Sequence, residues 1–185
     1  MKTWGSVAMV VLVLAGTAPR VHAEETFTSW LVSFTRQKEV APVSDQTYQK
    51  ECGACHFPYQ PGLLPERSWR KLLAADALAD HFGDNAELDE ATRAAIENFL
   101  TANSADKSYY KRSKKIMTSL KADQTPIRIT EVTYIRRKHH GIPESLIKGE
   151  RVKSLSFCDA CHRKAAQGSY DDDTVNIPGY GNWTW

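Results

Sequence analysis

Apolar residues recur at intervals of three and four through most of the chain, whereas convincing alternation of apolar and polar residues is not found. Intervals of three and four place apolar side chains on one face of a helix, and alternation would place them on one face of a strand. The pattern therefore predicts helices at about 44–56, 66–82, 89–102, 130–139, 143–148 and 155–167, with proline-containing loops at 58–65 and 125–127. The expected fold class is mainly α, with little or no sheet.

Residues that commonly begin or end helices support several of these boundaries. Ser68 and Thr130 are the expected N-caps of their helices, and Asp89 favours the start of a third. Gly83 and Gly168 follow two of the helices and are expected to end them. The helix after Asp89 carries an inward apolar stripe formed by Ile96, Phe99 and Leu100.

The start of the chain reads as a targeting segment rather than as part of the fold. Lys2 precedes an apolar run at 7–16, and the stretch ends in Val-His-Ala at Ala23, a small-residue cleavage pattern. A membrane span needs about 20 apolar residues, so an uncleaved anchor is the weaker alternative. We predict a secretory signal at 1–23, export to the periplasm with cleavage near Ala23, and no stable membrane insertion afterwards.

The remaining chain is electrically balanced. Its 162 residues include 22 basic and 22 acidic side chains. A formally neutral chain has no charge excess that would attract a polyanion. Nucleic acid is therefore not an expected partner.

A pentapeptide of the form Cys-x-x-Cys-His occurs twice, at Cys52–His56 and at Cys158–His162. Three chemistries use paired cysteines at this spacing: zinc binding, dithiol redox catalysis and covalent attachment of haem c. In an exported protein, disulfides between the two motifs are a further alternative.

Zinc binding and dithiol catalysis explain less of this pattern. Zinc ribbons usually bring two cysteine pairs together within about 15–20 residues. Here Cys55 and Cys158 lie 103 positions apart. A thioredoxin-like pair lies between a strand and a helix of a βαβ unit, which the hydrophobic pattern does not predict. Neither chemistry requires a histidine directly after both pairs.

Haem c accounts for every recurring position. Both thiols of a pair add to the vinyl groups along one edge of the porphyrin, and the next residue brings an imidazole to one face of the iron. We therefore predict two covalently bound haems c. The predicted attachment sites are Cys52 and Cys55 for the first haem and Cys158 and Cys161 for the second, with His56 and His162 as proximal iron ligands.

The sixth iron ligand decides what such a protein can do. Besides the motifs, the chain without its signal offers one methionine and three histidines: Met117, His81, His139 and His140. One methionine could ligate at most one iron, so two bis-histidine, low-spin haems are the economical assignment. Nearness along the chain pairs His56 with His81. The same argument pairs His162 with His139, and His140 is the alternative ligand. The two haems could also exchange their distal ligands.

On this assignment each half of the chain binds one haem. The expected organisation is an N-terminal haem c domain at 24–105 and a C-terminal haem c domain at 128–185. Residues 106–127 are rich in lysine and arginine and are interpreted as a solvated basic linker.

Several longer strings resemble the dihaem cytochrome c (DHC) family. The resemblance runs from about Tyr48 to Pro178 and rests on "YQKECGACHFPYQPGLLPERSW", "DHFGDNAELD", "RIT", "RKHHGIP" and "CDACHRKAAQGSYDDD". It places the family's second distal histidine on His139. The chain departs from the family pattern at Tyr134 and Ile135, where a more aromatic pair is expected.

The resemblance implies a small periplasmic electron carrier in which helices pack on two low-spin, bis-histidine haems. It also implies redox partners, namely a high-spin monohaem cytochrome c of the sphaeroides haem protein type and a membrane cytochrome b as electron source.

The function predicted from these observations is one-electron transfer from a membrane-side donor to a soluble haem acceptor, without catalysis of a substrate reaction. The alternative is a haem enzyme, a dihaem peroxidase or a small-molecule reductase, in which one iron keeps an open coordination position.

Overall fold

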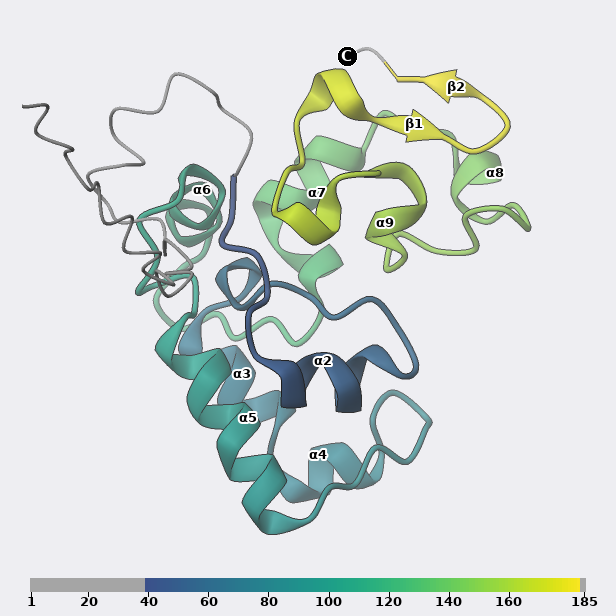
Figure 1. Cartoon of the computed structure of the whole chain (residues 1–185). Coiled ribbons are helices and arrows are strands. Elements are labelled where there is room, and N and C mark those ends of the chain that lie inside the picture. The colour runs from purple at the N-terminus through teal and green to yellow at the C-terminus, as the bar shows by residue number, and fades with distance from the viewer. Residues whose placement is uncertain (1–38, 184–185) are drawn as a thin grey trace, which may run out of the picture. The chain divides into compact units, whose positions relative to one another are not determined.

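The computed structural model describes residues 39–183, and these residues are mainly helical, as the sequence predicts (Figure 1). Eight α-helices are present in this part of the chain: α2 (Gln46–Gly53), α3 (Glu66–Leu72), α4 (Ala75–Ala79), α5 (Glu90–Ala102), α6 (Lys111–Ser119), α7 (Thr133–His139), α8 (Glu144–Ile147) and α9 (Cys158–Cys161). Short 3-10 turns connect them: η1 (Pro61–Leu63), η2 (Ile129–Glu131), η3 (Ala165–Gln167) and η4 (Asp172–Thr174). The predicted signal at 1–23 lies outside the described residues.

The first predicted haem segment contains two helices where the sequence pattern suggests one. The expected helix at 66–82 is divided into α3 and α4, with extended backbone at Ala74 (ψ 141°). Leu73 and Leu78 are both buried. On one continuous helix, residues five apart would point about 140° away from each other. The break allows both leucines to enter the core.

The expected cap at Ser68 is wrong. The N-cap of α3 is Pro65, whose extended backbone leads into the helix. Ser68 instead lies inside the first turn and is completely buried. Proline suits the entry to a helix because it has no backbone N–H and the first N–H groups have no helical partner.

Helix α5 follows its sequence pattern closely. The Asp89 carboxylate accepts a hydrogen bond from the Thr92 backbone N–H at 3.0 Å, which satisfies one of the free N–H groups at the helix start. Ile96 and Leu100 are completely buried, and Phe99 packs beside them. This face of α5 packs along α3 (Figure 1).

Two C-terminal helices are shorter than expected. The predicted N-cap Thr130 lies in η2, and α7 begins three residues later with Val132 as its N-cap. The predicted helix at 155–167 is reduced to α9 and η3, because His162 leaves the helix to form a β-bridge with Val175. Gly168 ends this segment as predicted.

Gly168 meets two demands that exclude other residues. Its φ is 77°, in the left-handed region that glycine adopts without strain. A Cβ atom at this position would lie 2.1 Å from the Val40 carbonyl oxygen. Gly168 therefore lets the C-terminal segment pack directly on the start of the described chain.

The described residues contain one small sheet. Strands β1 (Asn176–Ile177) and β2 (Gly181–Asn182) pair antiparallel, with Asn176 opposite Asn182. This hairpin lies near the C-terminal end, after the last quoted string of the family resemblance. Between residues 39 and 183, no helix combines the length and hydrophobicity needed to span a membrane.

A single main core joins the two halves. Its buried members include Val40, Tyr48, Leu63, Trp69, Ile96, Leu100, Ile116, Val132 and Tyr170. A smaller cluster of Val152, Val175 and Ile177 lies under the hairpin. The segment expected as a linker contributes α6, and Ile116 of α6 is completely buried. The division into two haem domains stays a prediction.

Candidate haem sites

The first motif brings its histidine next to a histidine from a distant turn. Cys52 lies in the last turn of α2, and Cys55 and His56 follow the helix. The imidazole rings of His56 and His81 are stacked, with centroids 6.4 Å apart and planes 19° apart.

A tight turn after α4 positions His81. The His81 backbone N–H donates to the Asp84 carbonyl at 2.7 Å, and the Asp84 N–H donates back at 3.3 Å. Between these residues Phe82 and Gly83 adopt positive φ angles of 60° and 104°. Positive φ is unusual for phenylalanine, so the fold holds strained backbone beside this histidine.

The second motif is arranged in the same way around another pair of histidines. Cys158 and Cys161 lie on α9, and His162 follows directly. His139 is the last residue of α7. The rings of His139 and His162 have centroids 6.1 Å apart, but their planes are inclined at 73°.

The structure distinguishes the two adjacent histidines of α7. His139 lines a cavity together with His162. His140 is exposed to solvent, and its Nδ1 lies 2.7 Å from the Arg137 carbonyl oxygen. Consecutive helix residues point about 100° apart, so only one of the two can face the second motif. The facing pairs are thus those expected from nearness along the chain.

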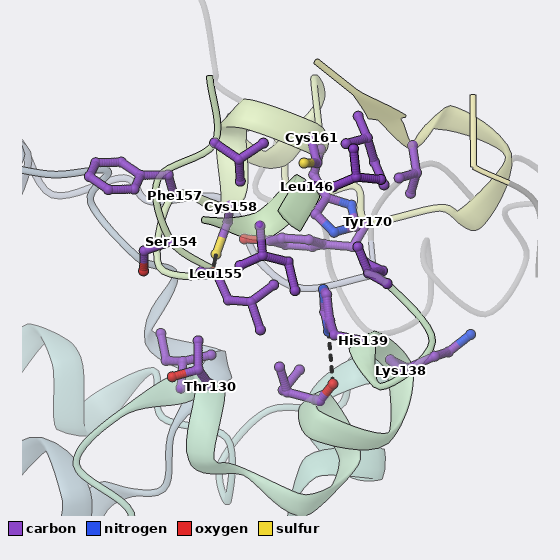
Figure 2. A pocket seen from close by; sticks show the side chains of 18 of the residues that line it. Thr130, Lys138, His139, Leu146, Ser154, Leu155, Phe157, Cys158, Cys161 and Tyr170 are labelled. Carbon is purple, nitrogen blue, oxygen red and sulfur yellow. Dashed lines mark hydrogen bonds between the residues drawn. The ribbon is translucent and has the colours of Figure 1, made fainter. Parts of the chain in front are cut away.

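The second site is a partly open cavity lined mainly by apolar side chains. Aliphatic side chains form much of its wall, including Ile135 of α7, Leu146 and Ile147 of α8, and Ile177 of β1. Figure 2 shows Cys158 and His139 pointing into the cavity from opposite sides.

Burial keeps the imidazoles in the form that binds metals. Desolvation lowers the pKa of His162 to about 4, and it also lowers the pKa of His139 and of His81. A neutral imidazole has a free nitrogen lone pair for an iron atom. These histidines are therefore unprotonated at neutral pH.

Hydrogen bonds to Nδ1 orient two of the rings. The Nδ1 of His56 lies 2.8 Å from the Phe57 carbonyl oxygen, and that of His139 lies 2.8 Å from the Ile135 carbonyl oxygen. Such a bond places the proton on Nδ1 and leaves Nε2 free as the ligand. The Nδ1 of His162 is buried without a hydrogen-bond partner among the described residues.

The thiols do not have the character of a catalytic dithiol. All four cysteines are free. Burial raises the pKa of Cys158 to about 12 and that of Cys52 to about 11. Redox-active cysteines have lowered pKa values because the thiolate is the reactive form. Between residues 39 and 183, no group of three or more His, Cys, Asp or Glu side chains is arranged to hold a metal ion, so a shared zinc site does not fit.

The residues at each site do fit a haem c. Each has two free thiols beside a pair of facing imidazoles, and the second also has a mainly apolar wall. Metal–imidazole bonds are about 2 Å long. Two such bonds plus the half-widths of two rings separate the centroids by about 6 Å, close to the 6.4 Å and 6.1 Å found.

Comparison with known proteins agrees with this fit. The family model for dihaem cytochrome c matches residues 48–170. The chain belongs to the dihaem cytochrome c family. Members carry two covalently bound c-type haems with iron, and this cytochrome is an electron carrier.

Solved structures of the same kind are similar over most of the chain. A dihaem cytochrome c from Rhodobacter sphaeroides is 39% identical, with 71% of this chain and 100% of that chain covered and a TM-score of 0.63. A dihaem cytochrome c from Shewanella baltica OS155 is 38% identical, with 75% and 97% covered and a TM-score of 0.61. Among curated proteins, no significant match was found.

Two tyrosines that sequence reasoning missed contact the histidines of the motifs. The Tyr59 ring stacks on His56 with centroids 5.0 Å apart, and its hydroxyl donates to the Ser156 carbonyl at 2.7 Å. The Tyr170 ring lies 5.1 Å from His162. Tyr59 is three residues after His56, but a lone tyrosine gives no sequence signal of a link to the second motif.

Arg112 is a second omission, because the basic segment around it was interpreted as solvated. Its guanidinium lines the cavity and is buried, forms an ion pair with Glu39, and donates to the Tyr170 carbonyl at 2.9 Å. Its Nε atom is buried without a partner among the described residues. The sequence of α6, with three lysines and one arginine, does not reveal which basic residue faces inward.

Proposed function

We propose that this protein is a periplasmic one-electron carrier in which each haem is attached through one motif and ligated by two histidines. The first haem would bind to Cys52 and Cys55 and the second to Cys158 and Cys161. The iron ligands would be His56 and His81 for the first haem and His162 and His139 for the second.

The observation that carries this assignment is the pairing of imidazoles at both sites. Each pair has the centroid separation that an iron between two nitrogens requires. The two pairs come from different parts of the chain and arise independently. Met117 packs against the main core instead, which supports histidine rather than methionine as the sixth ligand.

Two protein ligands on each iron favour electron transfer over catalysis. With both axial positions taken, a substrate has no vacant position at which to coordinate. Bis-histidine ligation also stabilises the ferric state more than histidine–methionine ligation, so low reduction potentials are expected. A haem enzyme with one open position remains the alternative, and rapid binding of carbon monoxide by the reduced native protein would favour it.

The compartment and the partners are proposed from the N-terminal sequence pattern and from the family resemblance. The N-terminal pattern at 1–23 supports export. Resemblance to the family supports a membrane cytochrome b as donor and a high-spin monohaem cytochrome c of the sphaeroides haem protein type as acceptor.

Electron paramagnetic resonance of the oxidised protein tests the ligation directly. Imidazole planes that are nearly parallel split the iron d orbitals strongly, whereas nearly perpendicular planes leave two of them close in energy. With angles of 19° and 73°, we expect two different low-spin signals, an ordinary rhombic one and one with a large maximal g value. A high-spin signal from the native protein would contradict the proposal.

A further inference from the structure

A basic groove lies beside the second haem site, on the outer side of α7. It is largely open to solvent. Four cationic side chains line it, Arg136, Arg137, Lys148 and Lys153. Serine, threonine and histidine side chains fill much of the remainder, and the lining of this groove contains no Asp or Glu among the described residues.

The basic groove continues into the cavity that holds the second pair of histidines. Five residues line both: Thr130, His139, Ile147, Ser154 and Leu155. A molecule lying in the groove would therefore be separated from the iron ligand His139 by no further layer of protein. A short distance between a bound redox partner and the haem raises the rate of electron transfer.

The charges of the groove are largely uncompensated. Lys148 forms an ion pair with Glu144 at 2.6 Å, but both side chains are more than two-thirds exposed, where such pairs are weak. In the part of the chain that the structure describes, Arg136, Arg137 and Lys153 form no ion pair. All four cations are exposed to solvent. They project a positive potential from the opening of the haem cavity.

We infer that the basic groove docks an acidic surface of a redox protein, which then exchanges electrons with the second haem. This inference rests on the proposed function, because it presupposes that the haem carries electrons. The cations are spread over α7 and the segment that follows α8, as the carboxylates of a protein surface would be. Complementary charges of this kind steer partners to the productive face and raise association rates.

The experiment measures electron transfer from a reduced plant-type ferredoxin, an acidic protein, to the oxidised cytochrome. One electron leaves the iron–sulfur cluster and converts a ferric haem to ferrous. Stopped-flow traces at low ionic strength give the second-order rate constant for the wild type and for Arg137→Glu/Lys153→Glu. The matched control, Lys71→Glu/Lys121→Glu, makes the same change in net charge at exposed lysines that line neither the groove nor the cavity.

We expect the groove variant to react about tenfold more slowly than the wild type, and the control to differ by less than about twofold. Added salt should slow the wild type and have little effect on the groove variant, because screening removes the same attraction.

A second variant separates the effect of lost charge on the rate from any effect of impaired folding. Lys153 has φ 69°, a conformation that glycine adopts more easily. Lys153→Gly therefore removes one charge without adding backbone strain, and its thermal midpoint should not fall. Its rate constant should still drop by about threefold.

The possible results distinguish the inference from the proposed function. Equal rate constants for the groove variant and its control would overturn the docking site. So would unchanged rates accompanied by a shifted haem potential, since the cations would then serve the haem propionates. A wild type that dithionite reduces but ferredoxin does not would also overturn the docking site while leaving the carrier function intact. A native high-spin iron would instead count against the carrier function.

Discussion

The two haem sites share the same pentapeptide but differ in their surroundings. At the first site Cys55 is exposed, and Phe82 beside His81 is 44% exposed. The neighbouring segment 76–90 contains six acidic residues and no lysine or arginine. At the second site the histidines line an apolar cavity, and the segment 132–153 contains six lysines and arginines against two acids.

This difference separates what the motif determines from what its environment determines. Two thiols and a histidine at fixed spacing suffice for covalent attachment and one axial ligand. Solvent exposure and nearby charge then set the reduction potential. An iron held in an apolar cavity beside exposed cations would disfavour the extra positive charge of the ferric state. We therefore expect the second haem to have the higher potential and to hold the electron at equilibrium.

The largest expected effect comes from removing one distal ligand. His139→Ala should convert the second haem to a high-spin form that binds carbon monoxide when reduced, because one axial position loses its ligand. The adjacent His140→Ala serves as the control and should leave both haems low-spin. Optical and paramagnetic resonance spectra report the change. If His140→Ala gave the high-spin form instead, the pairing of His139 with His162 would be wrong.

A smaller effect concerns the charge buried behind the second site. The Arg112 side chain is 8% exposed and its partner Glu39 is 19% exposed. Glu39→Gln would leave the guanidinium without a counter-ion, at a cost of about 2–3 kcal/mol in the free energy of unfolding. Denaturant titration of the oxidised protein measures this cost.

Helix α5 offers the matched control. Glu90 pairs with Arg93 but is 77% exposed, so Glu90→Gln should leave the free energy of unfolding unchanged within error. Equal costs for the two variants would show that the charges at the second site are not shielded from water.

The smallest expected effect concerns the difference in reduction potential between the two haems. Asp84 lies in the turn that positions His81, and its carboxylate favours positive charge nearby. Asp84→Asn should raise the potential of the first haem by several tens of millivolts or less and so narrow the gap between the two haems. Spectroelectrochemical titration measures both potentials. Asp123→Asn, at an exposed loop position, is the control and should leave the gap unchanged.

Helix boundaries show where sequence reasoning reached its limit. The start of α5 was predicted correctly because Asp89 caps its own helix and needs no distant partner. Ser68 was assigned the same role wrongly, because Pro65 begins α3 three residues earlier. The break between α3 and α4 depends on where Leu73 and Leu78 meet the core, which local pattern does not reveal.

The candidate site shows the same division. Cysteine spacing predicted both attachment motifs, since attachment chemistry needs residues that are neighbours in the chain. Tyr59, which packs on His56, bonds to Ser156 97 positions away, and Arg112 bonds to Tyr170 58 positions away. Contacts of this kind form when distant segments pack together, and nothing in the sequence of either segment indicates its partner.

By itself, the sequence determined the covalent chemistry of this protein, its helical character and a short list of candidate ligands, because each depends on residues close together in the chain. Tertiary structure decided which histidines face each other, that His139 rather than His140 enters the cavity, and that Arg112 is buried beside it. It also decided that one site lies open among acids and the other in an apolar pocket beside a basic groove. Those properties arise only when the chain folds back on itself, because burial and electric potential depend on every segment that packs nearby.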